Sequence, residues 1–531
     1  MNYNRHKMVD PKETINKIKV FLKDLQVNIK EHELLNTNGF KSQLLQLNTT
    51  PLFVNGKGTT DIFTQASAYG ELTERILSSV LFRFNYKMDQ KSIELDRNLS
   101  VVDSLGYDID FVNEKLNANI DQYFLNEIQK YYFKDLDEKK IVIETYEDYF
   151  NKESIDIPVS YIDAMYTTNG IAFGNTLLEA KIQGLSEVFE RYANRESVIN
   201  RMTLPMIENW EQLADDKLVE KINQFKDLNE LEIEVRSVCI KEQLPVVCVI
   251  VYKKNDGKYF VKFGAHFSFT VALERCFTEL MQGRKLENDF WKARIYPENK
   301  VLIEKNLEDI MKDGDGYYPP EFFNKESIDN FTYEFGEDND SALFIYEKLL
   351  LELGNKVYFK DYSYKGFNVC KFIVPDVSNV NLSMSNVLQW YRNNENHTRA
   401  LLNFVELDKN ERMQTIKYFK DLGVADNSLL TGFIKFPISY RDKLNYLTLS
   451  YLKSIDMILS GEEVKEFAYS KVVNSNYNKI KELLGKGNDK EIIYQALLYP
   501  RLNNNEIYIQ KQKISFNQEI KVLQDTINKN F

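Results

Sequence analysis

The acidic sequence Glu-x-x-Glu-Arg occurs twice in this chain, in the same local context each time. Residues 71–75 read ELTER and residues 187–191 read EVFER, 116 positions apart. Each copy follows a Gly/Thr-containing turn at the same offset, at 58–60 and at 174–176. A repeated helix that carries acid on one face predicts two halves of one structure that face each other across a shared site.

The length and charge of the chain limit the classes of protein to which it can belong. A chain of 531 residues is expected to form about two to four domains, and 43% hydrophobic residues are ample for globular cores. The net charge of −11 argues against a general surface for nucleic acid or for an anionic membrane. An anionic ligand therefore needs local Lys and Arg side chains or metal cations.

Neither the cysteines nor the apolar segments indicate secretion or a membrane. The four cysteines are scattered without a C-x-x-C pair, which argues against a disulfide scaffold and gives no zinc signature. Residues 1–20 lack the apolar core of a secretory signal. The longest apolar stretch, Leu244 to Tyr252, is too short to cross a bilayer and fits a buried strand. We therefore expect a soluble, cytoplasmic protein.

Local patterns predict a mixed α/β (α+β) main domain with pseudo-repeats over residues 1–390. The Asp-Pro pair predicts a helix over 10–24, and Thr60 can cap the helix that carries the first acidic copy. The polar stretch 300–342 is expected to form an insertion or surface loops. The remaining predicted elements are strands at 141–146, 160–166, 232–240, 245–252 and 258–267, a third Glu-bearing helix over 270–284, and a hairpin at the sheet edge over 356–377.

Residues 391–531 differ in composition from the rest of the chain. Gly and Pro become scarce there, and Leu, Ile, Lys and Tyr recur at helical spacing. This pattern predicts a separate all-α domain, although no clean 34-residue repeat signature is present. Helical hairpins often present grooves to other proteins, so we expect that this domain can hold a protein partner.

The acidic residues of the second helix form a single stripe. Residues three or four positions apart lie on one helix face, so Glu179, Gln183, Glu187 and Glu190 share a side. Opposing this stripe to the first helix, with Glu71 and Glu74, would gather five carboxylates. Such a group is tolerable if the acids stay solvated or if hard divalent cations bind between them. Magnesium fits the second case, because it prefers oxygen ligands and is often shared with phosphates.

Several simpler interpretations stay open on these residues alone. An isolated Glu-x-x-Glu-Arg is usually a solvated helix face, and Thr176 with Glu179 fits a capping box. The Gly-Lys-Gly turn around Lys57 is no Walker loop, because the required first glycine is Pro51, and Lys57 either lies near a phosphate or simply serves the turn. His266 is more typical of a structural hydrogen-bonding residue than of a catalyst.

Three segments together resemble the YcaO superfamily. The segment NGIAFGNTLLEAKIQGLSEVFERY (169–192) is similar to its central motif, NGKGTT…ASAYGELTER (55–75) to its upstream motif, and FGAHFSFTVALERCFTELMQGR (263–284) to its downstream motif. The motifs occur in the family's order, and the resemblance extends over roughly residues 1–390. The helical C-terminus resembles the subgroup that ends in a tetratricopeptide-like domain.

The resemblance implies a YcaO-type ATP-binding fold with ATP and Mg2+ as cofactors. Family members phosphorylate a backbone amide oxygen of a peptide, which makes the amide carbon electrophilic. By motif position, the magnesium ligands would be Glu71, Glu74, Glu179, Glu187 and Glu190. The nucleotide contacts would be Lys7, Thr14, Ser67, Asn175, Gln183, Arg191 and Arg275. Thr14 departs from the family's serine, and the motifs supply no obvious general base.

Two main hypotheses of function follow. The chain is either an amide-activating enzyme that acts on a peptide or protein, or a nucleotide-binding accessory protein without amide chemistry of its own. The end of the chain lacks the proline-rich tail of azoline-forming cyclodehydratases, which favours the subgroup linked to ribosomal-protein methylthiolation. A metal-carboxylate hydrolase unrelated to ATP is a third reading. A homodimer, the substrate and the nucleophile stay open, and neither nucleic acid nor membrane is an expected partner.

Overall fold

The structure is a computed structural model. It describes residues 6–47, 52–84, 88–240, 243–254, 257–282, 291–421 with gaps of one to three residues, 426, 430, 448–461 and 516–531. None of the helices in these ranges is long and apolar enough to cross a membrane.

An N-terminal layer pairs a small antiparallel sheet with two helices. Helix α1 (Pro11–Asp24) begins as predicted, with the Asp10 side chain accepting from the Lys12 amide. Strand β3 (Phe40–Leu47) is the centre of the sheet, and its neighbours are β1 (Ile29–Glu31), β2 (Leu35–Thr37) and β4 (Phe53–Gly58). Helix α2 (Asp61–Leu77) follows β4, and the Thr60 hydroxyl caps it by accepting from the Phe63 amide. Apolar side chains of α1, α2 and β3 form one core cluster.

A six-stranded antiparallel sheet forms the second body. Its order is β5-β6-β14-β15-β8, and β7 also pairs with β6. The strands are β5 (Ser100–Asp103), β6 (Lys140–Asp148), β7 (Ser154–Pro158), β8 (Ile171–Gly174), β14 (Tyr358–Asp361) and β15 (Asn368–Ile373). The accompanying short helices are α3 (Val80–Arg83), α4 (Gln90–Leu95), η1 (Ser104–Gly106), α5 (Ile109–Leu116), α6 (Gln122–Tyr132) and α7 (Val159–Met165).

A five-stranded sheet forms the third body, and its order is β12-β11-β10-β9-β13. The strands are β9 (Met206–Ile207), β10 (Leu231–Cys239), β11 (Gln243–Lys253), β12 (Tyr259–Ala265) and β13 (Ser327–Ile328). The helices are α8 (Leu177–Ile199), α9 (Trp210–Leu213), α10 (Asp216–Leu228), α11 (Phe269–Met281), α12 (Lys300–Asp313), η3 (Pro320–Phe323) and α13 (Asn339–Glu352). Helix α8 packs on β8 and β15 of the second sheet as well as on β11 and β12.

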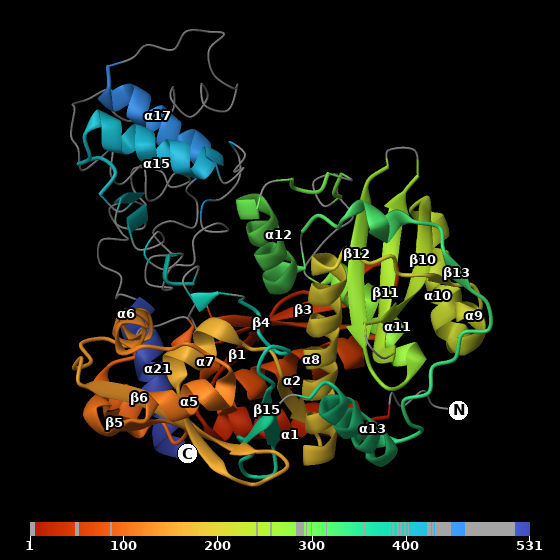
Figure 1. The fold of residues 1–531 in the computed structure, drawn as a ribbon, viewed down its shortest axis with the longest axis horizontal. Coiled ribbons are helices and arrows are strands. Elements are labelled where there is room, and N and C mark those ends of the chain that lie inside the picture. The colour runs from red at the N-terminus through yellow and green to blue at the C-terminus, as the bar shows by residue number, and fades with distance from the viewer. Residues whose placement is uncertain are drawn as a thin grey trace.

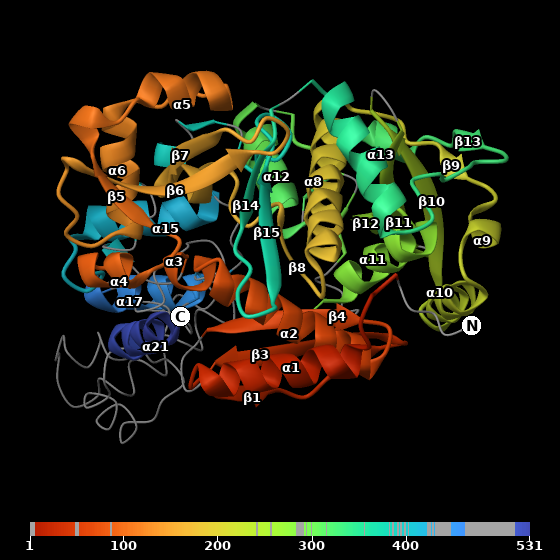
Figure 2. The same ribbon diagram turned by 90° about the horizontal axis from the view of Figure 1, so that it is seen from below.

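The three bodies meet around the long helix α8. Figure 2 shows the N-terminal layer along the lower edge, the second sheet on the left and the third on the right. Strands β4, β8 and β12 come from different sheets, and each leads directly into the helix that packs against it. The predicted mixed α/β fold class is therefore confirmed (Figure 1).

Three local predictions were wrong. Residues 160–166 form most of α7 and not a strand, since a short apolar run fits either state and this one begins after Pro158 with every residue buried. The polar stretch 300–342 contains α12, which packs on α8. The hairpin β14–β15 lies inside its sheet rather than at an edge, because β6 and β8 flank it.

The regular elements described beyond residue 390 are helical. They are α15 (Lys409–Asp421), α17 (Leu449–Leu459) and α21 (Phe516–Asn530). Helix α21 returns to the N-terminal layer, where Leu523 and Ile527 are buried in the core cluster of α1 and α2. The division at residue 390 stays a prediction, and the tetratricopeptide-like arrangement falls mainly on 462–515, outside the described residues.

Glycine lets each of the strand-to-helix connections fold back tightly. A Cβ atom on Gly174 would lie 2.3 Å from the Ala180 amide nitrogen, and one on Gly264 would lie 2.3 Å from the Ala272 carbonyl oxygen. These distances are too short for any side chain, so the strand and the following helix can approach this closely only with glycine there.

Replacing Gly174 by a residue with a side chain should therefore lower the stability of the fold. We expect Gly174→Ala to reduce the free energy of unfolding by about 1–3 kcal/mol, the usual effect of overpacking. Gly106→Ala is the control, because a Cβ there meets nothing within 4 Å. Urea unfolding of both variants measures the difference, and equal stability of the two would contradict the argument.

Candidate functional site

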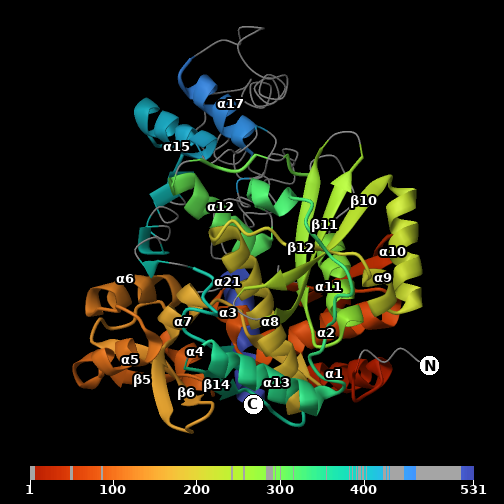
Figure 3. The same ribbon diagram turned by 45° about the vertical axis from the view of Figure 1, so that its right-hand side comes forward.

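The acidic helices share one construction, and it occurs three times. Helices α2, α8 and α11 begin after the N-cap positions Thr60, Thr176 and Ser268. Eleven residues after each cap stands a glutamate, and the three are Glu71, Glu187 and Glu279. Figure 3 shows the three helices converging at the centre of the molecule. The pseudo-repeat expected from two copies is therefore a set of three.

One cavity of about 540 Å³ lies where these helices meet. Its volume is in the range of small-molecule and nucleotide sites. Every residue that the sequence predicted for the site lines it, namely Lys7, Thr14, Ser67, Glu71, Glu74, Asn175, Glu179, Gln183, Glu187, Glu190, Arg191 and Arg275. Residues 184 positions apart in the chain, such as Lys7 and Arg191, thus face the same space.

One end of the cavity is a hydrogen-bonded group at the start of α8. The Thr14 hydroxyl donates to Asn175 Oδ1 at 2.6 Å, and Asn175 Nδ2 donates to Glu179 Oε2 at 2.9 Å. The Met8 amide also donates to Glu179, and Lys7 Nζ lies 4.0 Å from the same carboxylate. Glu179 is almost fully buried, and its amide bonds the Thr176 hydroxyl at 3.1 Å. Its carboxylate bonds the Asn175 amide instead of the Thr176 amide, so the capping box forms only in part.

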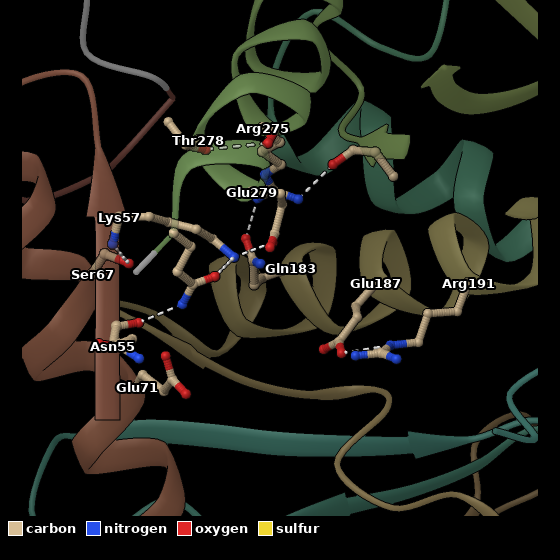
Figure 4. Close-up of polar contacts among 12 residues, drawn as sticks. Asn55, Lys57, Ser67, Glu71, Gln183, Glu187, Arg191, Arg275, Thr278 and Glu279 are labelled. Carbon is tan, nitrogen blue, oxygen red and sulfur yellow. Dashed lines mark hydrogen bonds and ion pairs between the residues drawn. The ribbon is translucent and has the colours of Figure 1, made fainter. Parts of the chain in front are cut away.

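Arginine side chains neutralise the acids along the centre of the cavity. Arg75 lies between two carboxylates, 3.2 Å from Glu74 and 3.6 Å from Glu71. Arg191 Nε donates to Glu187 at 3.0 Å (Figure 4). The same guanidinium donates to the Met311 carbonyl near the end of α12. Helix α12, which the sequence interpretation did not predict, therefore covers one side of the cavity.

Arg275 from α11 completes the wall opposite α2. Its guanidinium donates to Gln183 on α8 and to the Ala265 carbonyl at the end of β12. His266 lies beside it and accepts the Ser268 amide on Nδ1 at 3.0 Å. Burial and the nearby Arg275 and Lys7 hold the His266 pKa well below its usual range, so the ring is a neutral structural acceptor. This agrees with the structural interpretation of His266.

Burial makes several of these carboxyls hard to ionise. It raises the pKa of Glu74 to about 8, with the charges of Glu71 and Glu187 adding to the effect and Arg75 opposing it. Burial and the charge of Glu279 raise the pKa of Glu190 to about 7, and burial raises that of Glu71. A protein does not gain stability from such a group, which is typical of functional sites.

The carboxylates fit a divalent cation, although they do not already converge on one point. Among the described residues no group of three or more His, Cys, Asp or Glu side chains stands at metal-ligand spacing, and Arg75 and Arg191 pair with Glu71 and Glu187. Oxygen donors are the ligands that magnesium prefers, and a bound cation would relieve the repulsion that raises these pKa values. The donor set therefore suits magnesium shared with a phosphate group.

The sequence interpretation missed Glu279, and it left open whether Lys57 lies near a phosphate or only serves a turn. The Lys57 ammonium contacts Glu279, and Gln282 Oε1 lies 3.3 Å from the same Nζ atom. Both residues lie on the cavity wall. The distance of Glu279 from its helix cap equals that of Glu71 and Glu187 from theirs, and this spacing could have identified it. The third segment, however, reads Glu-x-x-Gln in place of Glu-x-x-Glu-Arg.

We expect Glu74→Gln to stabilise the ligand-free protein. A carboxyl with a raised pKa in the fold loses stability as pH rises from about 4.5 to about 8, because the unfolded chain releases its proton first. The gain should be on the order of 2 kcal/mol at pH 8.5 and small at pH 5. Thermal unfolding at both pH values measures it, and a loss of stability at pH 8.5 would refute the assignment.

A sequence model described as YcaO cyclodehydratase, ATP- and Mg2+-binding, matches residues 55–378. The chain is 29% identical to the ribosomal protein S12 methylthiotransferase accessory factor YcaO of Escherichia coli, over 68% of this chain and 63% of that protein. It is 28% identical to an uncharacterized protein of Haemophilus influenzae, over 69% of this chain and 65% of that one. The chain therefore spans slightly less than two thirds of either relative.

Solved structures give weaker matches. The YcaO protein of Methanopyrus kandleri bound with AMPPCP and Mg2+ aligns with a TM-score of 0.45 and 16% identity, over 70% of this chain and 92% of that one. A heterocyclase in complex with substrate and cofactor aligns with a TM-score of 0.46 and 17% identity, over 70% and 53%. Since the family's sequence model covers more than half of the residues, this chain belongs to the YcaO family of ATP- and Mg2+-binding proteins.

Proposed function

We propose that this protein uses Mg·ATP to phosphorylate a backbone amide oxygen of a peptide or protein. The observation that carries the proposal is the single cavity that combines carboxylates from α2 and α8 with cations from α8 and α11. Phosphoryl transfer needs positioned groups and neutralised charge more than covalent catalysis, and this cavity offers both.

Within this proposal the side chains divide into two sets. The metal set is Glu71, Glu74, Glu179, Glu187 and Glu190, and magnesium bound there would neutralise the triphosphate. The nucleotide set is Lys7, Thr14, Ser67, Asn175, Gln183, Arg191 and Arg275. The hydrogen bond from Thr14 to Asn175 supports the first part of the nucleotide set, because it joins the N-terminal segment to the turn before α8.

Guanidinium groups orient and stabilise the transferred phosphoryl group in this proposal. Arg191 and Arg275 reach the cavity from neighbouring helices, and the planar fork of each can bind two phosphate oxygens. Helix α12 covers this side, where its Met311 carbonyl fixes the Arg191 guanidinium. Exclusion of water there would favour attack by the amide oxygen over hydrolysis.

The biological setting proposed here is support of a protein modification. The Escherichia coli relative is named as an accessory factor of ribosomal protein S12 methylthiotransferase, which favours a role beside a modifying enzyme. The alternative is a nucleotide-binding accessory protein without amide chemistry of its own. In either case residues 391–531 are proposed to hold a protein partner. A peptide or protein is the proposed substrate, and a homodimer remains compatible with this role.

Nucleotide turnover should depend on the second acidic helix. We expect Glu187→Ala and Glu190→Ala each to weaken Mg·ATP binding or turnover on the order of 100-fold, as loss of metal-site residues commonly does. Glu196→Ala is the control, because Glu196 lies on α8 but pairs with Arg195 outside the cavity. Isothermal titration with a non-hydrolysable ATP analogue measures the binding, and phosphate release measures the turnover.

The outcomes separate the two functions. Turnover that Glu187→Ala abolishes supports the enzyme, whereas tight binding with no turnover in the presence of captured peptide partners supports the accessory role. Metal-dependent hydrolysis without any binding or turnover of nucleotide would overturn both and favour a metal-carboxylate hydrolase.

A further inference from the structure

Lys57 is a cation built into the wall of the cavity beside the acids. It lies near the end of β4, and its ammonium contacts the Glu279 carboxylate on α11, 222 residues away in sequence (Figure 4). Gln282, which follows the last residue of α11, bonds Lys57 through Oε1 at 3.3 Å and the Asn55 carbonyl through Nε2 at 2.8 Å. The lysine therefore joins the N-terminal layer to the third body across the site.

The charges around Lys57 belong to the acidic set of the cavity. Burial disfavours the ammonium, but the negative charges of Glu279, Glu71 and Glu190 outweigh it and raise the Lys57 pKa. In return, Lys57 lowers the pKa of Glu279 despite that residue's burial. Lys57 and Glu279 are therefore both ionised, and Lys57 neutralises carboxylates from all three helices.

The backbone at Lys57 is fixed, so only its side chain can move. Its amide donates to Ser67 Oγ at 3.3 Å, and the residue pairs with Ser42 of β3. The glycines on both sides lie against α2, since a Cβ on Gly56 would come within 2.4 Å of the Ala68 nitrogen. The long, flexible stem of lysine can nevertheless swing its charge by several bond lengths.

Only the first of the three strand-to-helix units carries this cation. The positions equivalent to Lys57 before α8 and α11 are Phe173 and Ala265. A general structural need of the unit would therefore not explain a lysine here. The lysine at position 57 is instead explained by its contact with Glu279 in the cavity.

We infer that Lys57 is a positioning residue that stands in for a divalent cation at Glu279 in the ligand-free protein and turns to the triphosphate when the metal enters. This inference rests on the proposed function. A metal ion that approaches Glu279 and Glu71 would repel the ammonium, because like charges at short distance in a poorly solvated site are unfavourable. The anionic triphosphate is the partner that would receive the displaced charge.

The first test titrates Mg2+ without nucleotide into wild type and three variants. Lys57→Met should melt at a lower temperature than wild type without metal, yet bind Mg2+ about tenfold more tightly, a difference of about 1.4 kcal/mol, because no tethered cation competes. Lys57→Arg keeps the charge and should rescue wild-type behaviour. Lys181→Met is the matched control, since Lys181 lies on α8 over the Tyr149 and Phe359 rings, outside the cavity. Equal or weaker Mg2+ binding by Lys57→Met would overturn the inference.

The second test measures nucleotide affinity at saturating Mg2+. Lys57→Met should weaken ATP binding about tenfold and leave AMP binding within about threefold, since only the triphosphate receives the ammonium. Equal loss for both nucleotides, or for neither, would refute the transfer of charge to the triphosphate. Failure of wild type to bind Mg·ATP would refute the proposed function instead, and the metal-only comparison of Lys57→Met with wild type would still judge Lys57.

Discussion

The balance between burial and repulsion of carboxylates governs the centre of this molecule. Glutamates on α2, α8 and α11 face one cavity, and cations such as Arg75, Arg191 and Lys57 lie among them and favour their ionisation. Each of these cations is tethered to its own helix or strand, so the neutralisation is incomplete. The raised pKa values of Glu74 and Glu190 show that burial and repulsion between carboxylates still disfavour their ionised forms. A mobile divalent cation and its nucleotide are the natural complement of such a site.

The architecture supplies this balance by repeating one simple unit. A strand has a glycine at its end or one residue before it, the chain turns at a cap, and a helix folds back onto the strand with a glutamate in its fourth turn. Three sheets each contribute one such unit, and close packing at the glycines brings the helices to one point. The site therefore belongs to no single sheet. A displacement of the second or the third sheet would therefore reach the site through helix α8, which packs on both.

Much of this arrangement was predictable because it depends on local chemistry. Asp10 and Thr60 are caps with strong intrinsic preference, and a spacing of three or four residues places acids on one helix face in any fold. The strands over 232–267 were predictable for the same reason, since β-branched runs bounded by turns have few alternatives. Segment 160–166 was mistaken for a strand because a buried helix of one to two turns leaves no periodic signature.

By itself the sequence determined the duplicated acidic helices, their caps and the resemblance to a family, since all three follow from residue types at fixed spacing. The tertiary structure alone decided that Glu279 belongs with the acids, that α12 roofs the cavity, and that Lys57 is the cation opposite α11. The physical reason is that spacing along a helix fixes which side chains share a face. The pairing of a particular buried cation with a particular buried acid depends instead on contacts between segments hundreds of residues apart.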